Sequence, residues 1–267
     1  MVMKTLWLLL IALGLGVICG GCETNPVTGD QELILVSHEQ EKLMGAEASQ
    51  QVEKELGQSV KDTQLQSYIN SVGQSIARIS HTPDEGFSYK AIDHQSVNAF
   101  ALPGGYIYIT TGLLKELNSE AQLASVLAHE TAHVTARHIA QQITRNILID
   151  VGFGVAGSQA SSSAIRVANI VRQLEGMSFT REQEKQADEV GLDYLVKAGY
   201  TPYGMIETME ILQRASGSRT IEFFSTHPNP ENRIGYLQER IYNKGYRGEG
   251  KTGQSEYAAN VLTRLGK

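Results

Sequence analysis

The sequence has few cysteines, few charged residues and no long hydrophobic run. Only two cysteines occur in 267 residues, Cys19 and Cys22, so no disulfide framework stabilises the fold. Charged residues make up 19% and hydrophobic residues 41%, which excludes an intrinsically disordered chain. A net charge of −6 leaves the chain without the excess of cations that nucleic-acid phosphates attract. The composition therefore indicates a globular protein with its own core and excludes nucleic acid as the main partner.

The first 21 residues have the pattern of a secretory signal peptide. Lys4 is followed by an apolar run of 13 residues, Leu6–Ile18. This run is shorter than the about 20 apolar residues that a membrane-spanning helix needs. A positive start followed by a short apolar run is typical of a signal peptide, which is removed from the mature protein. An uncleaved membrane anchor is the alternative for this segment.

Cys22 is the predicted site of lipid attachment. The small residues Gly20 and Gly21 precede it and resemble the lipobox of bacterial lipoproteins, although Cys19 stands where Leu is usual. A lipobox implies that the Cys22 thiol is acylated and becomes the new N-terminus. By analogy with enterobacterial lipoproteins, Glu23 favours the outer membrane. A C-x-x-C redox pair is a weaker interpretation of the two cysteines, because no βα unit surrounds them. We therefore expect a lipoprotein on the periplasmic side of the cell envelope.

The rest of the chain predicts a helix-rich α+β fold. A tether is expected over residues 22–36, one folded domain over 37–243 and a weakly ordered tail over 244–267. Residues 152–164 carry no charge and are interpreted as a mobile loop. Capping residues and apolar spacing predict helices over 37–56, 62–79, 119–149, 180–198 and 202–216, and a short one that ends near 242. Alternating patterns predict strands over 87–92 and 106–110, which we expect to pair in a small sheet.

The main chemical signal is the H-E-x-x-H motif at His129–His133, inside the helix predicted over 119–149. Residues four apart lie one turn apart on the same helix face, so both imidazoles can bind one Zn²⁺ at about 2.0–2.1 Å. Glu130 lies about 100° around the helix from His129 and can face a water molecule beside the metal as general base. Two surface histidines beside a solvated glutamate are the alternative.

A catalytic zinc site also needs a third protein ligand and one open position. Ile139 stands where the extended H-E-x-x-H-x-x-G-x-x-H motif has its third histidine, so that ligand set is excluded. On a continuous helix His138 lies opposite His129, and it is interpreted as structural. The later helix carries Glu184 and Asp188 one turn apart. Glu184 is the predicted third ligand, and Asp188 the predicted hydrogen-bond acceptor that fixes the tautomer of a ligand histidine.

These motifs resemble the M48 family of zinc metallopeptidases, specifically its periplasmic lipoprotein branch without the tetratricopeptide extension. The motifs at 129–133 and 184–188 match the metal-site signatures of that family. Residues 98–105 resemble its N-A-F-x-x-P-G-G segment, and residues 25–29 resemble its opening motif. The resemblance covers nearly all of the mature chain. It implies a zincin-like metalloprotease domain with a small β-sheet beside the active-site helix, and one Zn²⁺ per chain.

The resemblance also draws attention to His227, which opens an H-P-x-x-x-x-R run. The resemblance implies that this run forms a loop near the metal. There His227 either donates a hydrogen bond to the developing oxyanion or occupies the open zinc position in a resting state. A structural loop histidine held by Pro228 is an equal alternative. The strand over 106–110 is expected to bind substrate by edge pairing. The predicted substrate-binding residues are Asn98, Tyr106, Ile107 and Tyr108.

The sequence thus predicts a zinc metalloendopeptidase that cleaves unfolded or misfolded proteins of the cell envelope. Edge pairing recognises the backbone of an extended chain more than its side chains, which suits such substrates. One alternative is an envelope chaperone that binds polypeptides and has a latent zinc site. Another is a structural zinc or interaction lipoprotein without turnover.

Fatty-acid labelling tests the lipid anchor. Cells that produce this chain in the presence of a radioactive fatty acid should label the wild type and leave Cys22→Ala unlabelled, because acylation needs the Cys22 thiol. The label is measured after electrophoresis of the immunoprecipitated protein. Equal label in both proteins would contradict the prediction.

Overall fold

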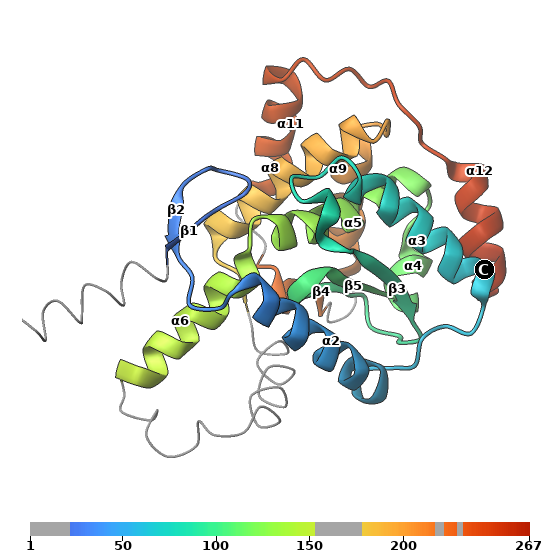
Figure 1. Cartoon of the computed structure of the whole chain (residues 1–267). Coiled ribbons are helices and arrows are strands. Elements are labelled where there is room, and N and C mark those ends of the chain that lie inside the picture. The colour runs from blue at the N-terminus through green and yellow to red at the C-terminus, as the bar shows by residue number, and fades with distance from the viewer. Residues whose placement is uncertain (1–21, 153–177, 217–221, 229–231) are drawn as a thin grey trace, which may run out of the picture.

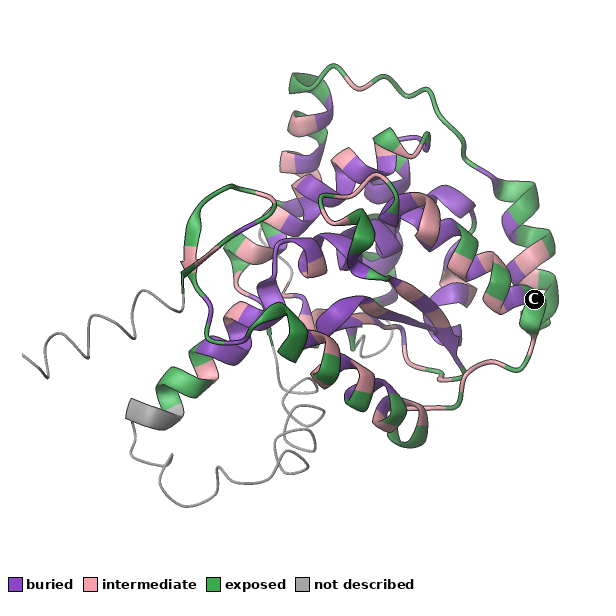
Figure 2. Ribbon diagram, in the orientation of Figure 1, coloured by how far each residue is buried: buried purple, intermediate pink, exposed green. Residues whose placement is uncertain are grey.

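The computed structural model describes residues 22–152, 178–216, 222–228 and 232–267. Its centre is helix α5 (Glu120–Thr135), in which every residue except Val134 is buried. Helices α3 (Thr63–Ala77), α8 (Arg181–Lys197) and α9 (Tyr203–Ser216) pack around α5, and a small sheet lies beside it (Figure 1). Buried residues concentrate where these elements meet (Figure 2). The predicted helix-rich α+β fold with a small sheet beside the central helix is confirmed.

Most predicted helices begin at the expected capping residues. The side chains of Ser37 and Thr180 form capping boxes at the starts of α2 (His38–Glu55) and α8, and Asp62 caps α3. After α8, Gly199 takes φ +89°, a conformation that glycine adopts without strain. The remaining α-helices of the described chain are α4 (Thr111–Glu116), α6 (His138–Gly152), α10 (Phe223–Thr226), α11 (Arg233–Asn243) and α12 (Gln254–Tyr257). None of these helices is long and apolar enough to cross a membrane.

The sheet beside α5 has three strands in the order β3-β5-β4. The two predicted strands, β3 (Ser88–Ile92) and β5 (Tyr106–Thr110), pair as expected, and the structure shows that they run parallel. A third strand, β4 (Ala99–Leu102), was not predicted; it is four residues long and runs directly into the turn Pro103–Gly105. Because β4 pairs antiparallel with β5, it places β5 in the middle of the sheet.

The helix predicted over 119–149 is in fact two helices, which corrects that prediction. α5 ends at Thr135, Arg137 takes φ +56°, and α6 begins at His138. A left-handed conformation is unfavourable for arginine and persists only where surrounding contacts hold it. Here the buried Arg137 guanidinium donates to Glu41 Oε2 at 3.0 and 2.6 Å and to the Val36 carbonyl at 3.0 Å. The break depends on these tertiary contacts, so the local apolar pattern gave no sign of it.

Both ends of the described chain are more ordered than the sequence predicted. The expected tether contains a hairpin, in which β1 (Cys22–Thr24) pairs antiparallel with β2 (Gln31–Leu33). The expected weakly ordered tail includes α12 and a π-helix over Ala258–Leu262, because Tyr257 and Val261 lie one turn apart and are both fully buried. Of the predicted mobile loop 152–164, only Gly152 belongs to the described residues.

The contact between α5 and α8 gives a stability prediction. A Cβ on Gly191 of α8 would lie 3.0 Å from the His129 backbone nitrogen, so Gly191→Val should force the two helices apart. We expect a loss of about 1–3 kcal/mol in the free energy of unfolding, measured by urea denaturation. The control, Glu182→Val, introduces the same side chain at an exposed position of α8. Equal stability of the two variants would contradict close packing at this point.

Candidate metal centre

Four buried side chains converge from three helices at the centre of the molecule. His129 and His133 come from α5, Glu184 from α8, and His227 lies at the end of α10, with 2% exposure or less for each. The His129 and His133 Nε2 atoms are 3.1 Å apart, and His227 Nδ1 lies 3.3 Å from His129 Nε2. Glu184 Oε1 lies 3.3 Å from His133 Nε2 and 2.9 Å from His227 Nδ1. One metal ion can therefore contact all four side chains.

The spacing of these four atoms fits a tetrahedral metal ion. Bonds of about 2.0–2.1 Å place tetrahedral ligand atoms about 3.3–3.4 Å apart, close to the separations in the cluster. Three imidazole nitrogens and one carboxylate oxygen are a donor set that suits zinc. The predicted ligands His129, His133 and Glu184 are brought together, and His227 joins them.

Unpaired polar atoms support the same fit. Both carboxylate oxygens of Glu130, Glu184 Oε2 and His227 Nε2 are buried without a hydrogen-bond partner in the described part of the chain. Buried polar groups without partners are rare in proteins, since each loses the hydrogen bonds it makes in water. Their concentration around one point fits a site for a cation and a polar ligand.

Glu130 lies beside the cluster, as the sequence predicts for a general base. Its side chain is fully buried, and its Oε1 atom lies 3.5 Å from His227 Nε2. Burial raises the pKa of Glu130 above its usual value, although the nearby His227 and His129 oppose this rise. A carboxyl group with a raised pKa holds a proton more readily, which suits a group that both accepts and returns one.

Asp188 and Arg233 form an ion pair behind His129. Asp188 Oδ1 lies 3.0 Å from His129 Nδ1, the contact predicted for it. The fully buried Arg233 donates two hydrogen bonds of 2.5 Å to the Asp188 carboxylate, and its Nη1 lies 3.4 Å from Glu184 Oε2. Burial works to raise the pKa of Asp188, but the charges and hydrogen bonds of Arg233 and His129 together outweigh burial and hold that pKa below the usual value. Arg233 is the last residue of the H-P-x-x-x-x-R run that begins at His227, and its contact with Asp188 was not predicted from the sequence.

His138 also reaches the cluster, which the sequence analysis missed. Its Nδ1 lies 2.9 Å from His133 Nδ1, and its Nε2 lies 2.7 Å from the side-chain oxygen of Gln186. On an unbroken helix His138 would point away from His133, so the break at Arg137 creates this contact. On the other side, the Phe179 ring stacks on His133 with centroids 3.9 Å apart.

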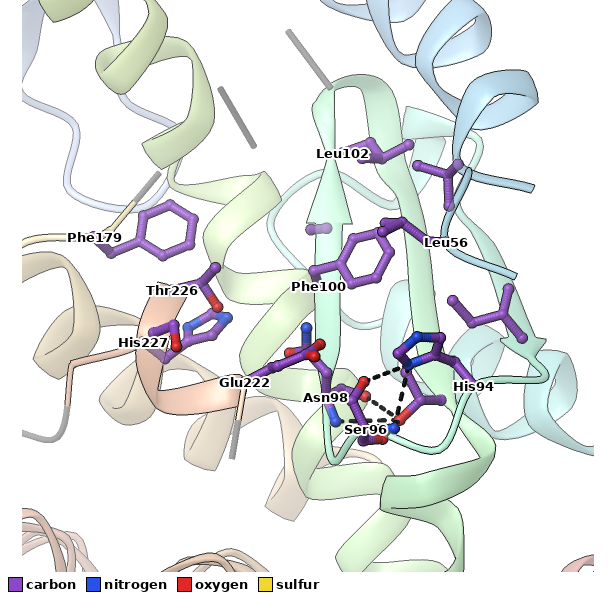
Figure 3. A pocket seen from close by; sticks show the side chains of 15 residues that line it. Leu56, His94, Ser96, Asn98, Phe100, Leu102, Phe179, Glu222, Thr226 and His227 are labelled. Carbon is purple, nitrogen blue, oxygen red and sulfur yellow. Dashed lines mark hydrogen bonds between the residues drawn. The ribbon is translucent and has the colours of Figure 1, made fainter. Parts of the chain in front are cut away.

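A cavity of about 320 Å³ extends from His227 along β4 to the end of α2 (Figure 3). Asn98, one of the predicted substrate-binding residues, lines this cavity. The expected edge pairing by β5 is wrong, because β5 has a hydrogen-bonded neighbour on each side and Ile107 and Tyr108 are buried. Among the described strands, β4 pairs on one side only and supplies three cavity-lining residues, Phe100, Ala101 and Leu102.

Comparison with known proteins identifies the family. The β-barrel assembly-enhancing protease of Escherichia coli K12 is 30% identical over 194 residues, which are 68% of this chain and 40% of that protein. The mitochondrial metalloendopeptidase OMA1 of Schizosaccharomyces pombe is 32% identical over 235 residues, 81% of this chain and 66% of that protein. The metalloprotease YcaL of Escherichia coli K12 is 24% identical over 187 residues, 67% of this chain and 73% of that protein. Residues 63–241 match the sequence model of peptidase family M48. This match covers about two thirds of the chain, which therefore belongs to peptidase family M48.

Proposed function

We propose that this protein is a zinc metalloendopeptidase that hydrolyses unfolded or misfolded polypeptides on the periplasmic side of the cell envelope. The observation that carries the proposal is the buried cluster of three histidines and Glu184, with Glu130 beside it and both Glu130 oxygens unpaired in the described chain. Attachment to the outer membrane through a lipidated Cys22 is part of the proposal. It rests on the sequence pattern at residues 1–22.

His129, His133 and Glu184 would hold the zinc ion. When bound, zinc polarises a carbonyl group and lowers the pKa of a water molecule towards about 7. Glu130 takes the proton of the attacking water and passes it to the leaving amine. Asp188 accepts from His129 Nδ1, which leaves the Nε2 lone pair of His129 for the metal. Arg233 and His129 together lower the pKa of Asp188, which favours the ionised form of Asp188 that this role needs.

The cavity beside β4 supports a polypeptide substrate. A strand that pairs on one side only leaves backbone groups for an extended chain, and such pairing is largely independent of sequence. The cavity walls near α2 are apolar, with Val52, Leu56 and Leu102 among them, so a large apolar side chain fits there. Unfolded chains expose such side chains, whereas folded proteins bury most of them.

The relatives support the same class of reaction and of substrate. Their names describe proteases and metalloendopeptidases, and one of them is named for enhancing β-barrel assembly. The chain spans 40% of that relative, so the activity and substrates proposed here rest on the site itself. An envelope role agrees with the signal-peptide pattern at the N-terminus.

A latent resting state is the second candidate, and the position of His227 favours it. The His227 Nδ1 atom lies 2.9 Å from Glu184 Oε1 and 3.3 Å from His129 Nε2, at the fourth corner of the cluster. A catalytic zinc site keeps one position open, so His227 in this place would block catalysis. We therefore propose that His227 closes the resting site and leaves it when substrate enters. A chaperone that binds polypeptides without cleaving them would keep the site closed.

Removal of the general base tests the main proposal. Glu130→Gln should lower the rate of cleavage of an unfolded model protein by at least about 100-fold, because an amide cannot accept the water proton. A chelator should abolish the wild-type activity. The matched control is Glu182→Gln, at an exposed position of α8, which should leave the rate unchanged. Equal rates for Glu130→Gln and the wild type would contradict the proposal.

His227→Ala tests the resting state. If His227 closes the fourth position, the variant should cleave unfolded protein several-fold faster than the wild type at saturating zinc. Phe223 stacks on His227 with ring centroids 4.4 Å apart, so Phe223→Leu should loosen the same closure and give a smaller increase. A large decrease would assign His227 to oxyanion stabilisation instead. An unchanged rate would remove it from the mechanism.

A further inference from the structure

In the opening motif at residues 25–29, the buried side chain of Asn25 contacts the end of the active-site helix α5. Asn25 is fully buried, and its Oδ1 accepts from the backbone nitrogens of Val27 and Thr28 at 2.8 and 3.3 Å. Its Nδ2 donates to the Ala136 carbonyl at 3.1 Å and to Glu32 Oε1 at 2.9 Å. One half of the amide thus closes the hairpin turn, and the other half binds the residue that follows α5.

Ala136 and Arg137 form an elbow between α5 and α6, which the N-terminal segment holds on two sides. Gln141 Nε2 donates to the same Ala136 carbonyl at 3.1 Å and to Glu32 Oε2 at 2.7 Å. Arg137, in its left-handed conformation, forms ion pairs with Glu41 and with Glu23. Figure 1 shows the β1–β2 hairpin beside the point where α5 ends and α6 begins.

The elbow determines where the His138 side chain points. The contacts of His138 in turn define the tautomers of His138 and His133. The Gln186 side-chain oxygen can only accept, so His138 Nε2 carries a hydrogen and His138 Nδ1 is an acceptor. His133 Nδ1, 2.9 Å away, must then be the donor. This leaves the His133 Nε2 lone pair directed at the cluster, as a metal ligand requires.

We propose that the N-terminal hairpin, residues 22–33, positions the zinc ligand His133 through this elbow. Asn25, Arg137 and His138 are positioning residues for the metal site, although none of them contacts the metal. The inference rests on the proposed function, since it assumes zinc at the cluster. The same contacts connect the hairpin, which begins at the proposed lipid anchor Cys22, to the metal site.

Zinc affinity tests the inference without relying on proteolysis. The dissociation constant of zinc is measured by competition with a chromophoric chelator on the purified full-length protein. His138→Phe keeps a ring of similar size but removes the acceptor, and it should weaken zinc binding by about 10–100-fold. Asn25→Asp keeps the oxygen that accepts hydrogen bonds in the turn but places a second oxygen against the Ala136 carbonyl. This variant should also weaken zinc binding.

A double mutant separates positioning from general destabilisation. If Asn25 acts through His138, Asn25→Asp combined with His138→Phe should bind zinc no more weakly than His138→Phe alone. Asp62→Ala, which removes the N-cap of helix α3, is the control. It should lower the melting temperature without changing the zinc affinity. The visible absorption of bound cobalt should shift in Asn25→Asp and not in Asp62→Ala.

Several outcomes would overturn the inference. Wild-type zinc affinity in Asn25→Asp would do so, as would additive effects in the double mutant. If Asn25→Asp does not fold, Gln141→Ala serves as the second variant, because it removes another hydrogen bond to the Ala136 carbonyl. An unchanged zinc affinity in Gln141→Ala would contradict the inference equally. A wild type that binds zinc tightly, with variants that bind it equally well, would leave the proposed function standing. A wild type that binds no zinc would overturn both.

Discussion

The structure depends on the burial of charged and polar side chains between α5 and α8. Glu130, Glu184 and Asp188 are all fully buried there, and burial of an unpaired charge costs several kcal/mol per ion. Arg233 compensates Asp188 directly and lies within 3.4 Å of Glu184. Both Glu130 oxygens and Glu184 Oε2 lack a hydrogen-bond partner in the described chain, and a bound cation would stabilise them. The core therefore combines close helix packing with a polar centre that a metal would complete.

Distant segments of the chain support this centre. α11 contributes Arg233, and Tyr236 of the same helix also hydrogen bonds to Asp188. α10 contributes His227, whose ring stacks on Phe223. The N-terminal hairpin reaches the end of α5 through Asn25. Since these contacts converge on two helices, a disturbance in any of the segments is expected to reach the metal site.

The sequence predicted the parts of the site that follow from local helix geometry. His129 with His133, and Glu184 with Asp188, are pairs four residues apart, and any helix places such pairs on one face. The general position of Glu130 follows from the same geometry. The pairing of β3 with β5 was also predicted and is confirmed, although its parallel direction was not predicted. These features need only a correct assignment of helix and strand.

The features that the sequence did not predict depend on tertiary contacts. The break at Arg137 requires Glu41 and the Val36 carbonyl, about 100 residues earlier in the chain, and it alone brings His138 to His133. The short strand β4 occupies the edge of the sheet next to β5, so β5 cannot pair with substrate as predicted. The C-terminal segment is ordered because Tyr257 is buried and donates to the Leu114 carbonyl at 2.7 Å. Local propensity carries no information about such partners.

Anomalous diffraction at the zinc absorption edge, from crystals of the purified protein, tests the central claim most directly. We expect one zinc peak per chain, about 2.0–2.1 Å from the Nε2 atoms of His129 and His133 and within bonding distance of Glu184. A peak elsewhere, or none at this cluster in zinc-replete protein, would contradict the account.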